Sequence, residues 1–195
     1  RSSSDNLPLR GILHPMDKQK ILAVRDQALA LIEKSGFALN EADMEGLAVN
    51  DFGLGNLDEE GMVFVDLLRS PRARFTLLVM TPGQSLPEHV HPPHDGDAGK
   101  EETMRVIWGQ AKVYVPGPPN NPAIRIPAGK DACYRVRHEV VLNQGDQYTI
   151  DPNLVHWFQA GPEGAVTLTV QNRVDETKNL FTDPMSTGCP IPLNQ

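Results

Sequence analysis

Gly83-Gln-Ser-Leu-Pro-Glu-His-Val-His91 is the stretch of sequence that decides the fold. A turn glycine is followed, after five residues, by the pair His89 and His91. In a β-strand, residues i and i+2 point to the same face of the sheet, so both imidazoles can face one point. The pair therefore predicts a strand that presents two imidazoles on one face, as a metal site requires.

Two later residues complete a set of metal ligands. Glu102 lies on the next predicted strand, in phase with Met104 and Val106, and His156 follows a turn region and leads into another predicted strand. Imidazole suits Zn, Cu, Fe and Ni, whereas a carboxylate favours harder divalent ions such as Mn. A chance pair of histidines followed by a carboxylate is not rare. The motifs around these residues must therefore distinguish a metal site from unrelated histidines. The predicted metal ligands are His89, His91, Glu102 and His156.

The composition favours a single domain that binds neither nucleic acid nor membranes. A chain of 195 residues is long enough to bury a substantial core in one domain. Its net charge is −7 and its pI is near 5.3, and no basic stripe is present, which argues against a polyanionic partner. No apolar run approaches the ~18 residues of a membrane span, and the polar start lacks the apolar core of a secretion signal. We therefore expect a cytoplasmic protein.

Two regions differ in their hydrophobic pattern. Residues 17–35 repeat apolar side chains at three- and four-residue steps, and a second short helix is expected over residues 40–47. Further along, strand-like runs alternate with turns, which fits a chain with 17 prolines and 16 glycines. The predicted fold class is all-β, a jelly-roll barrel over residues 51–195 preceded by an N-terminal helical extension over residues 1–50, in a single structural unit. Strands are predicted at 62–68, 74–80, 103–108, 112–115, 134–142, 147–150 and 165–172.

Two motifs resemble those of the cupin superfamily. The first contains Gly83, the two histidines, Glu102 and, after six intervening residues, Gly109, with a lengthened loop before the glutamate. The second runs from Gly145 to His156, with an Asp and an Asn where proline and glycine are commonest. The resemblance implies a cupin barrel, and it favours the metal site over scattered surface histidines.

A closer resemblance covers roughly residues 37–184. Residues 87–103, with their Gly- and Lys-rich insertion, are similar to the metal loop of cupin-type D-lyxose isomerases, and residues 51–55, 145–165 and 181–184 are similar to further landmarks of that family. The resemblance implies a Mn-dependent aldose–ketose isomerase, typically a homodimer. Its implied substrates are the free monosaccharides D-lyxose and D-xylulose, and often D-mannose and D-fructose.

The ligand set fits this chemistry. Aldose–ketose interconversion moves a hydrogen between C1 and C2, and negative charge develops on the sugar oxygens. A divalent cation bound to both oxygens acts as a Lewis acid and as a template. Three histidines and one glutamate leave two positions of an octahedral ion free for those oxygens. Mn²⁺ fits best, and Zn²⁺, Co²⁺ or Ni²⁺ can occupy the site in a preparation.

Acid–base chemistry needs further residues. If the strand begins early, Lys100 shares a face with Glu102, and its ammonium can stabilise an oxyanion, or shuttle a proton if its pKa is lowered. The alternative is a solvated loop lysine. Asp183, which can close over the barrel mouth, and Glu139, in a strand-like run, are further catalytic candidates; for Asp183 the alternative is a turn residue. Glu88 is left out because strand alternation turns it away from the metal.

Substrate contacts are predicted for Lys100, Gln84 and Phe158. Gln84 can hydrogen-bond sugar hydroxyls, and Phe158 shares strand parity with His156, so it can form a wall of the pocket. Two other functions remain open: an iron-dependent cupin dioxygenase, which uses the same ligand set, and a non-catalytic sugar-binding cupin. Oxygen uptake distinguishes the first from an isomerase, and turnover of D-lyxose distinguishes the second.

Overall fold

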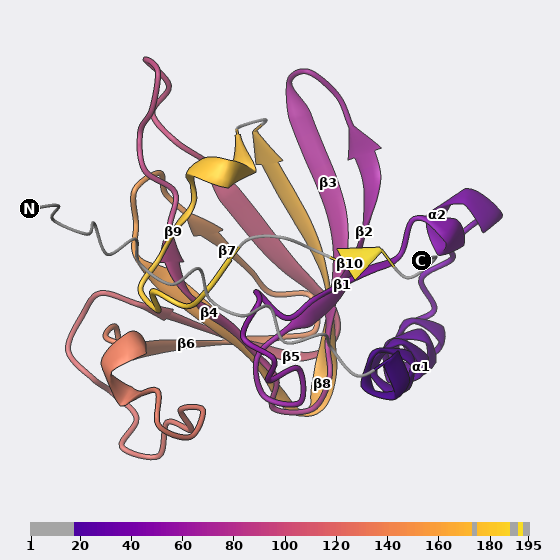
Figure 1. Ribbon diagram of the computed structural model, residues 1–195, viewed down its shortest axis with the longest axis horizontal. Coiled ribbons are helices and arrows are strands. Elements are labelled where there is room, and N and C mark those ends of the chain that lie inside the picture. The colour runs from indigo at the N-terminus through magenta and orange to yellow at the C-terminus, as the bar shows by residue number, and fades with distance from the viewer. Residues whose placement is uncertain (1–17, 173–174, 188–190, 193–195) are drawn as a thin grey trace, which may run out of the picture.

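The protein is a curled β-sheet with two helices on one side (Figure 1). The computed structural model describes residues 18–172, 175–187 and 191–192, and the all-β prediction is confirmed. The helices are α1 (Lys18–Ser35) and α2 (Glu41–Glu45), and the 3₁₀ turns are η1 (Asp131–Cys133) and η2 (Glu176–Lys178). The strands are β1 (Ala48–Asn50), β2 (Met62–Arg69), β3 (Ala73–Met80), β4 (Ser85–Val90), β5 (Glu102–Val115), β6 (His138–Asn143), β7 (Gln147–Ile150), β8 (His156–Asn172), β9 (Leu180–Phe181) and β10 (Ile191–Pro192).

Strands β5 and β8 form the centre of the sheet. They pair antiparallel from Glu102 opposite Gln171 to Tyr114 opposite Trp157. Strand β8 also pairs with β4 along its first half and with β3 along its second half. Two register shifts between β5 and β8 mark bulges, which bend a strand and increase its twist. The curl of the sheet brings β4 and the start of β8 together, which is where the site lies.

Helix α1 covers part of the outer face of this sheet. Its buried side chains recur at three- and four-residue steps and pack on strands β2, β3, β5 and β8. Burial of each of the larger aliphatic side chains stabilises this contact by about 1.5–3 kcal/mol. The helix predicted over residues 17–35 is confirmed from Lys18 onward. The buried residues of α1 are Val24, Ala28, Leu31 and Ile32.

The helical part of the predicted N-terminal extension ends before β1. Strand β1 falls within residues 1–50 but pairs with β2 and β10 of the barrel sheet. Residues 1–17 of the predicted extension lie outside the described part of the chain. Within the described part, none of the helices has the length and apolar character needed to cross a membrane.

Strand β5 differs from the prediction of two strands separated at Gly109. Gly109 has a φ of +76° and adjoins one of the register shifts, so the ladder absorbs its left-handed backbone and the strand continues. A Cβ atom at Gly109 would lie 2.2 Å from the carbonyl oxygen of Gly164. Only glycine permits so close an approach of the two central strands.

We expect Gly109→Ala to destabilise the fold more than Gly129→Ala. Both glycines have a φ of +76°, so each substitution carries a similar backbone strain of about 1–3 kcal/mol. Only at position 109 does the new methyl group meet backbone atoms within 4 Å. Urea denaturation followed by circular dichroism measures both free energies of unfolding. Equal losses of unfolding free energy in the two variants would show that the close approach of Gly109 to Gly164 does not matter for stability.

Candidate metal centre

A β-bulge in β4 turns His89 toward the barrel interior. Leu86 pairs with Phe158 and His89 pairs with His156, so β4 uses one residue more than β8 between these two pairs. Without the bulge, Leu86 and His89 would lie on opposite faces, because they are separated by an odd number of positions. Pro87 lies within the bulge, where it has no N–H group to leave unpaired.

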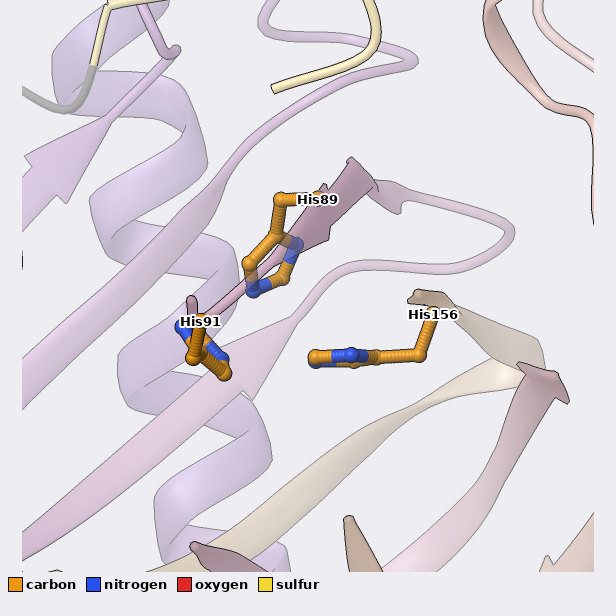
Figure 2. Close-up of side chains that lie close together, drawn as sticks. All are labelled: His89, His91 and His156. Carbon is orange, nitrogen blue, oxygen red and sulfur yellow. The ribbon is translucent and has the colours of Figure 1, made fainter. Parts of the chain in front are cut away.

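Three imidazoles converge inside the barrel (Figure 2). The ligand nitrogens of His89, His91 and His156 all lie within 4.8 Å of one another. Ring centroids are 4.3 Å apart for His89 and His156, and 4.7 Å apart for His89 and His91. The side chains are buried, with exposed fractions of 7%, 2% and 0%. This arrangement, predicted from three separated positions in the sequence, lets all three nitrogens contact one ion.

A hydrogen bond at Nδ1 orients each imidazole. His89 contacts the carbonyl oxygen of the residue two positions earlier, and His156 does the same, both at 2.8 Å. His91 instead contacts the side-chain oxygen of Asn179, at 2.8 Å. These acceptors place the proton on Nδ1, which leaves the lone pair of Nε2 free to bind a metal.

The Nε2 atoms of His91 and His156 are buried without a hydrogen-bond partner among the described residues. A buried polar atom without a partner costs about 1–3 kcal/mol, so two such atoms side by side need an explanation. A divalent cation accepts both lone pairs and removes this cost. The residues present therefore fit a metal ion.

Burial keeps the imidazoles of His89 and His156 neutral. Desolvation, together with the neighbouring His156 and His91, holds the pKa of His89 well below its ordinary value. Desolvation and the neighbouring His91 also lower the pKa of His156 to about 3. Neutral imidazole is the form that binds metals, so these two residues need not lose a proton at neutral pH.

Glu102 brings a carboxylate to the same place. Its Oε2 atom lies 3.4 Å from Nε2 of His91 and 2.9 Å from Nζ of Lys100. Burial alone would raise the pKa of Glu102, but the neighbouring Lys100 and His91 together outweigh burial and hold the pKa well below its ordinary value. An anionic oxygen therefore lies beside the three imidazoles, where the predicted fourth ligand is needed.

Lys100 lies beside Glu102 and is buried, so it is not a solvated loop lysine, although β5 begins only at Glu102 and does not include Lys100. It is 6% exposed, and its ammonium contacts Glu102 at 2.9 Å and Glu176 at 3.3 Å. Burial lowers the pKa of Lys100, but the two carboxylates outweigh burial and raise it. The lowered pKa considered for a proton shuttle is therefore not found. Lys100 is held as an ammonium, the form that stabilises an oxyanion.

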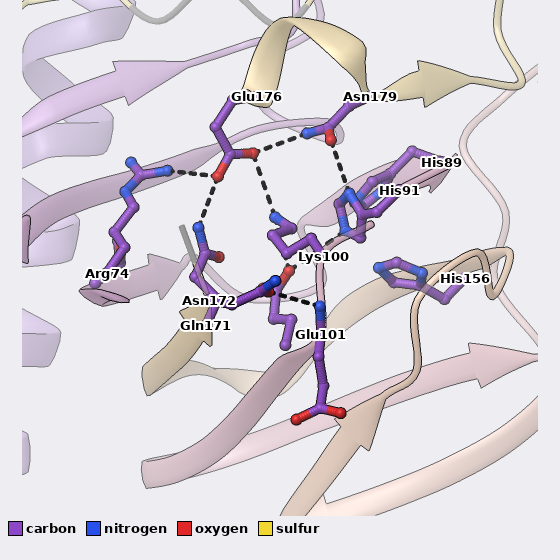
Figure 3. Close-up of polar contacts among 12 residues, drawn as sticks. Arg74, His89, His91, Lys100, Glu101, His156, Gln171, Asn172, Glu176 and Asn179 are labelled. Carbon is purple, nitrogen blue, oxygen red and sulfur yellow. Dashed lines mark hydrogen bonds and ion pairs between the residues drawn. The ribbon is translucent and has the colours of Figure 1, made fainter. Parts of the chain in front are cut away.

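Glu176 connects Lys100 to a polar network that the sequence did not indicate (Figure 3). One of its carboxylate oxygens accepts hydrogen bonds from Arg74 at 3.0 Å and from Gln171 at 2.6 Å. The other accepts from Lys100 at 3.3 Å and from Asn179 at 2.9 Å. Glu176 lies in a short 3₁₀ turn without a recognisable motif, so no signal in a single sequence marks it or Asn179.

Two aromatic rings border the imidazoles. The ring of Phe158 lies 5.2 Å from that of His156, centroid to centroid, so this predicted pocket residue is brought to the site. Phe181 of β9 lies 5.5 Å from His89, although its role in the site was not predicted. An apolar wall of this kind limits the access of water to polar groups in the site.

Gln84 has no free amide group to offer to a sugar hydroxyl, because both ends of its side chain bond to backbone groups. Its side chain is fully buried, and its amide N–H donates a hydrogen bond to the carbonyl of Leu57 at 2.6 Å. Its amide oxygen accepts a hydrogen bond from the backbone N–H of Thr81 at 3.0 Å. Both ends of the amide thus hold backbone segments together, which is a structural role.

Glu139 lies on the outer face of the sheet. It pairs with Tyr114, which in turn pairs with Trp157, and paired residues share a face. Trp157 and His156 are consecutive in β8, so they face opposite sides. The Tyr114 hydroxyl donates a hydrogen bond to Glu139 at 2.7 Å. Because Glu139 faces away from the imidazoles, its position does not support the predicted role of carbon base. The sequence could not show this, since a strand-like run alone does not reveal which of its residues face inward.

Asp183 belongs to a second polar cluster. Its carboxylate pairs with Lys130 and accepts a hydrogen bond from the backbone N–H of Met185 at 2.9 Å. Lys130 also lies 3.7 Å from the fully buried Glu60, which accepts a hydrogen bond from the Tyr134 hydroxyl at 2.6 Å. These contacts anchor the segment that follows β9, as the alternative of a turn residue implies.

Comparisons with known proteins agree with this geometry. No family model matches the chain. A D-lyxose ketol-isomerase from Thermofilum sp. is 42% identical over 170 residues, which are 87% of this chain and 94% of that protein. A D-lyxose/D-mannose isomerase from Thermosediminibacter oceani is 39% identical over the same shares of the two chains. A solved structure of L-ribose isomerase from Cellulomonas parahominis has a TM-score of 0.70 at 17% identity, and the match covers 91% of this chain and 97% of that chain.

The curled sheet and its buried histidines define a cupin-type barrel with a candidate metal centre. The class expected from the two sequence motifs is thus confirmed. The sequence identity to curated relatives goes further, because it extends over most of both chains. The chain belongs to the cupin-type D-lyxose isomerase family.

We expect His156→Ala to remove binding of a divalent ion, because it takes away one of the three convergent nitrogens. The matched control is His138→Ala, on β6, whose Nδ1 contacts the carbonyl of Pro118 and which lies outside the triad. Titration of EDTA-stripped protein with Mn²⁺ or Co²⁺ by calorimetry measures the affinity of each variant. Wild-type affinity in His156→Ala would rule out the triad as the metal site.

Proposed function

We propose that the protein is a metal-dependent aldose–ketose isomerase that acts on free sugars. The proposed reactions interconvert D-lyxose with D-xylulose and D-mannose with D-fructose. Two observations support this: the names of relatives at 39–42% identity, and a buried histidine triad whose open nitrogens fit a cation. The triad is the single feature on which the chemistry depends.

The proposed metal ligands are the three histidines and Glu102. The mixed donor set of imidazoles and one carboxylate favours Mn²⁺, with Zn²⁺, Co²⁺ and Ni²⁺ as alternatives. When bound, such an ion supplies Lewis-acid stabilisation to the negative charge that develops on the sugar oxygens. Glu102 suits the role of ligand because its pKa is held low, so it offers a negative charge at neutral pH.

Lys100 is the proposed donor to a developing oxyanion. Its buried ammonium lies 2.9 Å from the proposed ligand Glu102, so a sugar held beside the metal ligands meets it. Its raised pKa means that it stabilises negative charge as a cation and does not serve as a base. The Phe158 and Phe181 rings keep the imidazole side of the site apolar, which strengthens such charge interactions.

The other residues predicted to take part in catalysis or substrate binding receive structural roles. In this proposal Asp183 anchors the segment that carries Phe181, and Gln84 and Glu139 stabilise the barrel outside the reacting centre. The names of the relatives favour an isomerase over the dioxygenase and the non-catalytic cupin. A homodimeric assembly and a cytoplasmic location complete the proposal; both rest on the sequence expectations.

The proposal predicts ketose formation that depends on added metal. EDTA-stripped protein is reloaded with Mn²⁺, Co²⁺, Zn²⁺ or Ni²⁺ and offered D-lyxose, D-mannose, L-ribose and mannose 6-phosphate, with products separated by chromatography. We expect D-xylulose and D-fructose to form, fastest with Mn²⁺, and no product without metal. Full activity of the stripped protein, or oxygen uptake in place of isomerisation, would reject the mechanism.

We expect Lys100→Met to lower kcat by about a hundredfold or more, the usual cost of removing a donor to an oxyanion. The metal content should stay at the wild-type level, because Lys100 is not one of the proposed ligands. Lys112→Met is the matched control, since Lys112 lies 3.6 Å from the outward-facing Glu139. Steady-state kinetics with D-lyxose and elemental analysis give both readouts. An unchanged kcat would remove Lys100 from the mechanism.

A further inference from the structure

The hydrogen bond from His91 to Asn179 sets this imidazole apart from the other two. His89 and His156 are oriented by carbonyl oxygens two positions earlier, which cannot be changed by substitution of a side chain. His91 relies on a side chain 88 positions later in the sequence. We propose that Asn179 is a positioning residue, which holds His91 in the orientation and tautomer required for metal binding. The inference rests on the proposed metal site.

Strand pairing places Asn179 beside His91. In the antiparallel pair of β4 and β9, Phe181 lies opposite His89 and Leu180 lies opposite Val90. One step further along the same register brings Asn179 opposite His91. The contact at 2.8 Å is therefore a consequence of strand register and not of a freely placed loop.

Glu176 fixes which end of the Asn179 amide faces the imidazole. The amide Nδ2 donates a hydrogen bond to Glu176 at 2.9 Å, so the amide oxygen is the atom left for His91. An amide turned the other way would place its N–H donors against the Nδ1–H of His91 and its oxygen against the carboxylate. Both contacts would be repulsive, so the carboxylate determines the proton position on His91 through Asn179.

Glu176 is itself held in place by two groups on neighbouring strands. Arg74 of β3 and Gln171 of β8 donate to one carboxylate oxygen, at 3.0 and 2.6 Å, and leave the other oxygen for Asn179 and Lys100 (Figure 3). One carboxylate thus orients both a proposed metal ligand and the proposed oxyanion donor. Hydrogen bonds to the outer nitrogen of a ligating histidine commonly contribute about 10- to 100-fold in metal affinity.

The test compares metal binding by wild type, Asn179→Ala, Asn179→Asp and Thr177→Ala. Asn179→Ala removes the acceptor, whereas Asn179→Asp keeps an oxygen for His91 but replaces the donor to Glu176 by a second, negatively charged oxygen. Thr177→Ala is a control for loosening of the same 3₁₀ turn, because Thr177 is exposed and bonds only to Asp175 among the described contacts. Competition with a chelator gives Mn²⁺ and Co²⁺ affinities. NMR spectra of the Co²⁺ protein report the exchangeable Nδ1–H protons of ligating histidines.

We expect Asn179→Ala to bind Co²⁺ about 10- to 100-fold more weakly than wild type, and one of three shifted Nδ1–H signals to disappear through exchange with water. Asn179→Asp should lose less affinity and keep that signal, and Thr177→Ala should match wild type in both. Unchanged affinity and three signals in Asn179→Ala would overturn the inference while leaving the metal site intact. Equal losses in Asn179→Ala and Thr177→Ala would also overturn it. Absence of metal binding in the wild type would reject both the inference and the proposed function.

Discussion

Burial of imidazole nitrogens that have no protein partner is the constraint on which the site depends. The Nε2 atoms of His91 and His156 point into the barrel interior, where water is scarce and no described donor reaches them. A protein that only needed stability would fill these positions with apolar side chains, because an unpaired buried polar group costs about 1–3 kcal/mol. The bulge in β4 and the curl of the sheet serve to bring these costly groups together, which is why the barrel and the site cannot be explained separately.

Local sequence determines part of this site well. The spacing of His89 and His91 predicts two imidazoles on one side of the chain, and the structure brings them together. It also places Lys100 beside Glu102 and Phe158 beside His156. Each pair is separated by two positions of an extended backbone, although His91 lies just after β4 and Lys100 just before β5. The prediction of the barrel is equally local, because it depends on turn glycines, prolines and strand-length runs.

Contacts that join distant segments could not be predicted in the same way. Asn179 reaches His91 only through the pairing of β9 with β4, and a two-residue strand leaves no periodic pattern to detect. The inward or outward direction of Glu139 depends on the register of β6 against β5, which a strand-like run does not contain. Gly109 was expected to end a strand, yet a bulge lets the ladder continue through it. Each difference comes from tertiary pairing and not from local preference.

The two carboxylates around Lys100 explain how a buried ammonium can remain charged and in place during a reaction. A lysine with a single buried partner would lose most of its stabilisation when that carboxylate turned to another cation, and desolvation would then favour the neutral amine. Lys100 has a second partner in Glu176, which is held independently by Arg74 and Gln171. Glu102 can therefore serve as a ligand without removing the charge from Lys100. In the proposed mechanism, one carboxylate serves as a metal ligand and the other keeps Lys100 charged beside it.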